Sequence, residues 1–93
     1  MVEIKWTNKS INDLKSIFEY IAQDSKKYAS LQIKKIKERT KQLKIQPLSG
    51  RTVLEFDDLN IRELIEGNYR IVYMIYEQKI FILTVHHSAK LLS

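Results

Sequence analysis

Hydrophobic residues change their spacing near the middle of the chain. The first segment, 2–6, alternates as a short strand does, and Thr7 or Asn8 is a suitable cap for a following helix. Two stretches then carry apolar residues at helical spacing: Ile11, Leu14, Ile17, Phe18 and Ile21 in one, Ala29, Ile33, Ile36, Thr40 and Leu43 in the other. Because Pro47 and Gly50 end the second stretch, the first half predicts a strand and then an antiparallel pair of helices.

The second half has the periodicity of strands. Apolar runs at 60–66, 69–76 and 80–87 predict three strands, and 51–56 predicts a shorter one. Gly67-Asn68 fits a two-residue type II′ turn between the first two runs. The order predicts a single α+β domain over residues 1–93, with the pattern β-α-α-β-β-β and room for one more strand. In this fold a helical hairpin packs on one face of a mostly antiparallel sheet.

The turns predict which residues face each other across the strands. The glycine turn sets Arg62 opposite Tyr73. If Gln78-Lys79 is a second two-residue turn, Arg70 faces His87. Cross-strand partners lie on the same face of a sheet, roughly 5 Å apart at Cβ. The sequence therefore predicts that Arg70 and His87 are neighbours.

The chain has two histidines, and they are adjacent. Successive residues of a strand point to opposite faces, so His86 and His87 cannot bind one metal ion while the strand stays regular. Cysteine and the H-x-x-x-H spacing are both absent from the sequence. We expect no metal and no cofactor. His87 is the candidate functional residue, and His86 is expected to pack on the opposite face.

Both faces of the predicted sheet are apolar. One carries Ile61, Ile65, Val72, Met74, Leu83 and Val85, and the other carries Leu64, Ile71, Tyr73, Ile75 and Ile82. Two helices can cover only one face, and a half-exposed sheet normally alternates apolar with polar residues. A protein partner is the favoured cover for the second face. The alternative is that the chain's own loops and termini, with a second copy, cover it.

Positive charge is concentrated in the first half of the chain. The net charge is +5; residues 1–50 carry eleven Lys and Arg against five Asp and Glu, whereas residues 51–93 carry five against six. Lys34, Lys37, Lys41 and Lys44 form a stripe beside the apolar one on the second helix, called the basic ridge below. Such a surface attracts nucleic acid or another polyanion. The simpler interpretation of the basic ridge is a helix face that is solvated and has no binding partner.

Several functional classes are excluded by composition. Without cysteine there are no disulfides and no thiolate chemistry. No stretch approaches the roughly 20 apolar residues of a membrane span, and the N-terminus has no signal-peptide pattern. A cytoplasmic location is expected. A phosphate-binding glycine loop, G-x-S-x-G and H-E-x-x-H are also missing.

The strands carry a group of cations that suits an anionic ligand. Arg62, Arg70 and Lys90, with His87 near them, are typical of phosphate binding because guanidinium groups bind phosphate in a bidentate manner. They would also suit RNA cleavage, in which a base activates the 2′-hydroxyl and cations stabilise the developing charge. The structural alternative is that Arg62 and Arg70 form ion pairs with acidic residues on their own or adjoining strands.

Four motifs occur in order along the chain. They are P-x-S-G-R at 47–51, I-R-E-L at 61–64, N-Y-R-I-V-Y at 68–73 and V-x-H-x-x-K at 85–90. With the helical segments "DLKSIFEYIA" and "IKKIKERTKQLKIQ", they resemble the RelE/ParE superfamily of bacterial type II toxins. The likeness is greatest to the ParE or plasmid-stabilisation branch, and it runs from about Trp6 to Leu91.

The resemblance implies a growth-inhibiting toxin that is held inactive, in a hetero-oligomer, by the C-terminal segment of a cognate antitoxin. RelE-like members cut mRNA in the ribosome, and ParE-like members poison DNA gyrase. Arg70 matches the arginine that the nucleases use on the scissile phosphate, and His87 and Lys90 fall where a second basic group is kept. These three would be catalytic in a ribonuclease. However, the tyrosine that often follows is absent and Lys90 replaces the usual arginine, which favours the ParE branch.

The predicted target- or antitoxin-binding residues are Arg51, Arg62, Arg70, His87 and Lys90, and no catalytic residue is assigned. Three functions stay open. The first is a toxin that inhibits DNA gyrase or another topoisomerase without being an enzyme. The second is a ribosome-dependent mRNA endoribonuclease. The third is a basic nucleic-acid-binding module without toxicity.

Overall fold

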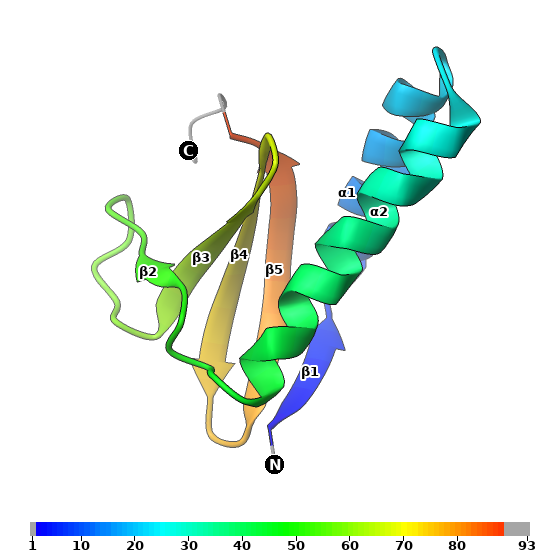
Figure 1. Cartoon of the computed structure of the whole chain (residues 1–93). Coiled ribbons are helices and arrows are strands. Elements are labelled where there is room, and N and C mark those ends of the chain that lie inside the picture. Colours follow the sequence, from blue (N-terminus) through cyan, green and yellow to red (C-terminus); the bar gives the residue numbers. More distant parts are fainter. Residues whose placement is uncertain (1, 89–93) are drawn as a thin grey trace.

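The computed structural model describes residues 2–88 (Figure 1). Its elements are β1 (Glu3–Trp6), α1 (Asn8–Ala22), α2 (Lys26–Lys41), the short 3-10 helix η1 (Gln42–Lys44), β2 (Arg51–Thr52), β3 (Ile61–Glu66), β4 (Tyr69–Tyr76) and β5 (Lys79–His87). The strand order is β1-β5-β4-β3-β2, with β1 parallel to β5 and the other pairs antiparallel. The predicted α+β class is confirmed, although the strand expected at 51–56 is only two residues long.

Both helices begin at a capped N-terminus. The Thr7 hydroxyl accepts a hydrogen bond from the Ser10 N–H, and the Ser25 hydroxyl accepts one from the Tyr28 N–H. The helices lie side by side on one face of the sheet, and their far end extends beyond the strands (Figure 1). No helix among residues 2–88 is long and apolar enough to cross a membrane.

The main core lies between the helices and the sheet. Its buried members are Leu14, Ile17, Ile36, Leu43, Leu64, Tyr69, Ile71, Tyr73, Ile80, Ile82 and Val85. Apolar spacing identified most of them, because buried residues of a helix or strand recur with its period. The placement of Val85 on the other face was wrong: it pairs with Ile71 and belongs to the helix-side core.

The first hairpin has the predicted register, and the second does not. Arg62 pairs with Tyr73 as expected. The second turn is Glu77-Gln78, one residue earlier than predicted, and a β-bulge between Val72 and Tyr73 shifts the pairing of β4 with β5 once more. The predicted pairing of Arg70 with His87 is therefore wrong.

Part of the face away from the helices is covered by the chain itself. Val53 and Val72 are each 1% exposed although neither belongs to the helix-side core. An ion pair between Glu55 and Arg70 holds the segment after β2 against this face. The alternative prediction, that the chain's own loops cover the second face, is thus correct for part of that face. The rest remains open, as at Ile65, which is 38% exposed.

Candidate functional site

A network of alternating charges lies on the sheet face away from the helices. Arg70 donates from Nε to Glu63 Oε1 at 3.0 Å and forms a second, closer contact from Nη2. Its Nη1 lies 3.6 Å from Glu55 Oε2. On the other side, Arg51 Nε donates to Glu63 Oε2 at 2.7 Å. The structure therefore brings together two predicted binding residues, Arg51 and Arg70, around one buried carboxylate.

Strand geometry explains this network. Glu63 pairs with Arg51 across the β2–β3 ladder, and it is a diagonal neighbour of Arg70, which pairs with Ile65. Long side chains reach such diagonal neighbours. Burial works against the charge of Arg70, but its bonds to Glu63 and Glu55 outweigh burial and raise the pKa of Arg70 above the ordinary value. The expected structural alternative, an ion pair from Arg70 to an adjoining strand, is what the structure contains.

A shallow depression of about 400 Å³ lies over the network. Arg51, Glu55, Glu63 and Arg70 supply its charged side chains, and Leu54 is among the apolar residues that line it. The side chain of Arg51 is 70% exposed, whereas that of Arg70 is 11% exposed. Arg51 is thus the more accessible of the two arginines to a ligand from solution.

Arg62 bonds to backbone carbonyls of two loops. Its Nε donates to the Leu59 carbonyl at 3.1 Å and its Nη1 to the Gly50 carbonyl at 2.9 Å. Arg62 therefore joins the loop before β2 to the loop before β3. Within residues 2–88 Arg62 forms no ion pair with the acidic residues of its own strand, Glu63 and Glu66, so the structural alternative offered by the sequence is not what the structure contains for Arg62.

The second tyrosine of N-Y-R-I-V-Y, Tyr73, holds the P-x-S-G-R segment in place. The Tyr73 hydroxyl donates to the Pro47 carbonyl at 2.8 Å and accepts from the Gly50 N–H at 2.9 Å. A Cβ on Gly50 would lie 2.5 Å from that hydroxyl and 2.7 Å from the Glu63 carbonyl oxygen. Only glycine fits this close approach. Three of the four motifs that carry the family resemblance thus meet as a structural unit beside the arginine network.

The two histidines exchange the positions that the sequence predicted. His86, not His87, pairs with Arg70, while His87 pairs with Tyr69 and stacks edge-to-face on its ring, with centroids 5.6 Å apart. Neighbouring residues of a strand face opposite sides, so His87 lies on the helix side of the sheet. Lys90 lies outside the described residues.

The imidazole of His86 is partly buried. Its Nε2 is buried and has no hydrogen-bond partner within residues 2–88. Burial, and then the nearby charge of Arg70, lower the pKa of His86 below the ordinary 6.5. The imidazole is therefore neutral at pH 7, next to a permanently charged guanidinium.

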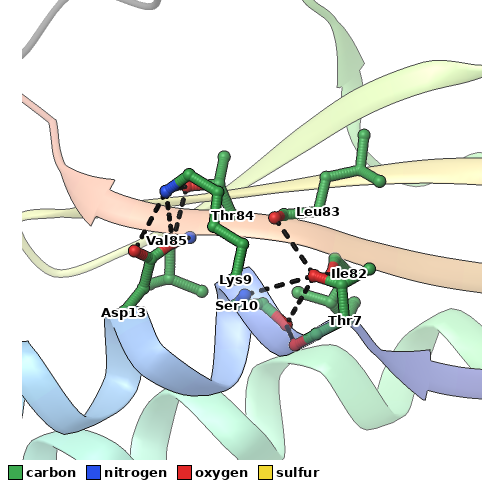
Figure 2. A network of polar contacts seen from close by, with 8 residues as sticks. All are labelled: Thr7, Lys9, Ser10, Asp13, Ile82, Leu83, Thr84 and Val85. Carbon is green, nitrogen blue, oxygen red and sulfur yellow. Dashed lines mark hydrogen bonds and ion pairs between the residues drawn. The ribbon is translucent and has the colours of Figure 1, made fainter.

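Figure 2 shows how the start of α1 is attached to β5. Because β1 pairs only with residues 79–82, the rest of that edge of β5 has no neighbouring strand among residues 2–88. Asp13 occupies it, accepting from the Val85 N–H at 3.0 Å and the Thr84 hydroxyl at 2.7 Å. Burial raises the pKa of Asp13, but hydrogen bonds from Thr84, Val85 and Lys9 outweigh it and lower the pKa below 3.8.

A groove of about 630 Å³ runs between α1 and this end of β5. Asp13, Tyr20 and Tyr69 line it together with both histidines. Among the described residues, no cluster of three or more His, Cys, Asp or Glu could hold a metal ion. The groove therefore offers hydrogen-bonding and aromatic surface, without a set of metal ligands.

Sequence reasoning missed three of the residues that shape these sites. Glu63 had a signal, because it is a charged residue between Ile61 and Ile65 on an otherwise apolar strand face. Glu55 and Asp13 had none, because a surface loop and the polar border of a helix normally carry acids. Their partners are determined only by the tertiary fold.

Comparison with known proteins agrees with these features. The family model of the ParE toxin of type II toxin-antitoxin system, parDE, matches residues 4–92. The fold is similar to a chain of the chromosomal ParDE TA system from P. aeruginosa, with a TM-score of 0.77 and 22% identity over 94% of this chain and 96% of that one.

Two further solved structures share the fold. A chain of the toxin-antitoxin complex RelBE2 from Mycobacterium tuberculosis has a TM-score of 0.66 and 21% identity over 92% of this chain and 96% of that one. The YoeB dimer from Staphylococcus aureus has a TM-score of 0.59 and 22% identity over 89% and 92%. Comparison with curated proteins gives no significant match. Because the family model spans nearly the whole chain, the chain belongs to the ParE family of type II toxin–antitoxin toxins, within the RelE/ParE superfamily.

Proposed function

We propose that this toxin acts by binding DNA gyrase or a related topoisomerase, and that it does not cut RNA. The observation that carries the proposal is the separation of two residues that a nuclease of this superfamily would combine. Arg70 lies on the face away from the helices, and His87 lies on the helix side, opposite Tyr69. General acid–base catalysis needs its groups within hydrogen-bonding reach of one reacting centre.

The surroundings of Arg70 also support binding rather than cleavage. The Arg70 side chain is 11% exposed, and its guanidinium bonds to two carboxylates, those of Glu63 and Glu55. A substrate phosphate would have to displace Glu55 and would meet the negative charge of Glu63. Electrostatic stabilisation of a transition state requires donors that are preorganised toward the developing charge, and here the donors are already engaged.

The test is to express the chain without antitoxin and follow two signatures in the same culture. We expect filamentous cells, DNA-damage signalling and intact mRNA, and we expect the purified chain to inhibit supercoiling by gyrase. His87→Ala should leave these effects in place. Rapid arrest of translation with mRNA cut at ribosome-positioned codons would overturn the proposal.

A ribosome-dependent mRNA endoribonuclease is the second candidate, and one observation favours it. His86 pairs with Arg70 across the strands, and its lowered pKa leaves it neutral and able to accept a proton at pH 7. If the chain cuts mRNA, His86 is the expected base. Cleavage should then be lost on His86→Ala and retained on His87→Ala, with circular dichroism to establish that both variants fold.

We further propose that a cognate antitoxin neutralises the toxin by covering the open part of the face away from the helices. The ParDE and RelBE2 assemblies are toxin–antitoxin systems by name. On this chain, Ile65 is 38% exposed and Leu54 is 98% exposed beside the accessible guanidinium of Arg51. Such a surface suits a segment that carries apolar side chains and a carboxylate.

Two measurements test this partner surface. Without a partner, the purified chain should self-associate; a monodisperse monomer at high concentration would count against the proposal. Arg51→Glu and Ile65→Asp should weaken capture of a small acidic protein encoded beside the toxin. The control is Lys79→Glu, at an exposed position at the start of β5. Equal loss in all three variants would mean that only net charge or folding had changed.

A further inference from the structure

The outer side of α2 carries a continuous band of positive charge. All four lysines of the basic ridge are exposed: Lys34, Lys37 and Lys41 on α2, and Lys44 on η1. Their spacing of three and four residues places them on one side of the helix. At about 1.5 Å per residue the ridge is roughly 15 Å long.

Acidic residues are scarce around this charge. Glu38 is the single acidic residue between positions 26 and 44, and within residues 2–88 no carboxylate forms an ion pair with a lysine of the ridge. Two lysines outside the ridge do form ion pairs, Lys5 with Glu3 and Lys9 with Asp13. A band of uncompensated lysines is expected to attract a polyanion from solution.

The opposite side of the helix limits what that polyanion can be. Ala29 and Ile36 on α2, and Leu43 on η1, are 0% exposed in the contact with the rest of the fold. A helix that binds a lipid surface inserts its apolar side, and between positions 34 and 44 both apolar residues, Ile36 and Leu43, are buried in the fold. The partner must therefore be held through charge alone, which is the mode of binding of a nucleic-acid backbone.

The shape of the surface favours duplex DNA over duplex RNA. The ridge lies toward the C-terminal end of α2, the end beside the strands (Figure 1), and its four lysines are exposed. A helix with one exposed side can lie along the wide major groove of B-form DNA, whereas the major groove of A-form RNA is too deep and narrow to admit side chains. Phosphates are closely spaced along either rim of the DNA groove, so four lysines can make contacts without reading the base sequence.

We propose that the basic ridge binds the phosphate backbone of duplex DNA independently of sequence. The inference does not depend on the identity of the toxin's target. In the function proposed above, the ridge would hold DNA while a different surface engages the topoisomerase. The arginine network and the histidines take no part in this contact.

The experiment is fluorescence anisotropy of the full chain with a labelled 25-base-pair duplex of arbitrary sequence, over a series of salt concentrations. We expect log affinity to fall with log salt with a slope of about −3 to −4 if all four lysines contact phosphate. Lys34→Glu with Lys41→Glu should weaken binding roughly tenfold or more and reduce the slope by about 2. A second duplex of unrelated sequence should bind equally well.

The matched control is Lys15→Glu with Lys79→Glu, which changes the net charge equally at exposed positions on α1 and β5. It should weaken binding much less. Equal weakening by the two double variants would overturn the proposal, because binding would then follow net charge alone. Tighter binding to duplex RNA, to polyglutamate or to anionic vesicles would also overturn it and assign the ridge to that partner.

Discussion

The guanidinium of Arg70 and the carboxylate of Glu63 form an ion pair that is buried on the sheet face away from the helices. Their side chains are 11% and 3% exposed. Arg51 binds the second oxygen of the same carboxylate, but its own side chain is 70% exposed. One carboxylate thus has two arginine partners that differ mainly in burial.

This difference leads to the first prediction. Glu63→Ala should lower the free energy of unfolding by about 3–5 kcal/mol, because it leaves the Arg70 charge buried without its main partner. Arg51→Ala removes a partner of the same carboxylate at an exposed position and should cost less than about 1 kcal/mol. Urea denaturation of both variants measures this. Equal losses would mean that burial does not determine the strength of the pair.

The second prediction concerns the Tyr73 hydroxyl. Tyr73→Phe leaves the Gly50 N–H and the Pro47 carbonyl without their partner and should destabilise the fold by about 1–3 kcal/mol. Tyr76→Phe is the control, because Tyr76 is 59% exposed and should tolerate the change. Gly50→Ala should be worse than either, since its Cβ would meet the tyrosine ring and backbone of β3. Thermal melts of the three variants provide the test.

The third prediction follows from the lowered pKa of His86. In the unfolded chain the His86 imidazole has a pKa near 6.5, so as the pH falls it takes up a proton before the folded protein does. The contribution of neutral His86 to stability is therefore complete above pH 6.5 and declines as the pH falls through that value. His86→Gln should reduce this decline between pH 7.5 and pH 5.5. Arg70 and Lys9 lower the pKa, while Asp13 and Glu63 partly oppose them. An unchanged pH profile in the variant would show that His86 does not control it.

The fourth prediction concerns Asp13 at the free edge of β5. Asp13→Ala leaves the Val85 N–H and the Thr84 hydroxyl without their acceptor and should cost about 1–3 kcal/mol at pH 7. The folded pKa lies below 3.8, so this stabilisation is present above pH 3.8 and is lost as the pH falls through the folded value. Wild type and variant should therefore converge in acid. Asp24→Ala, at an exposed acid beyond α1, is the control and should have little effect at either pH.

The sequence by itself determined the elements, the layering and the family. Apolar residues at periods of 3.6 and 2 predicted the two helices and the three main strands, because a buried face repeats with the period of its element. Gly67, with φ of +59°, determined the first hairpin, since few other residues adopt that conformation. The motifs identified the family because they lie where the close approach of Gly50 to Tyr73 restricts the choice of residue.

Only the tertiary structure decided which residues share a site. The second turn places Glu77 at a positive φ of 56°, which a sequence pattern does not favour for glutamate, and the bulge beside Tyr73 leaves no periodic signal. A one-residue shift in a strand moves each side chain to the other face. That shift placed His86, and not His87, across from Arg70, and it separated the residues that the sequence had grouped as one site.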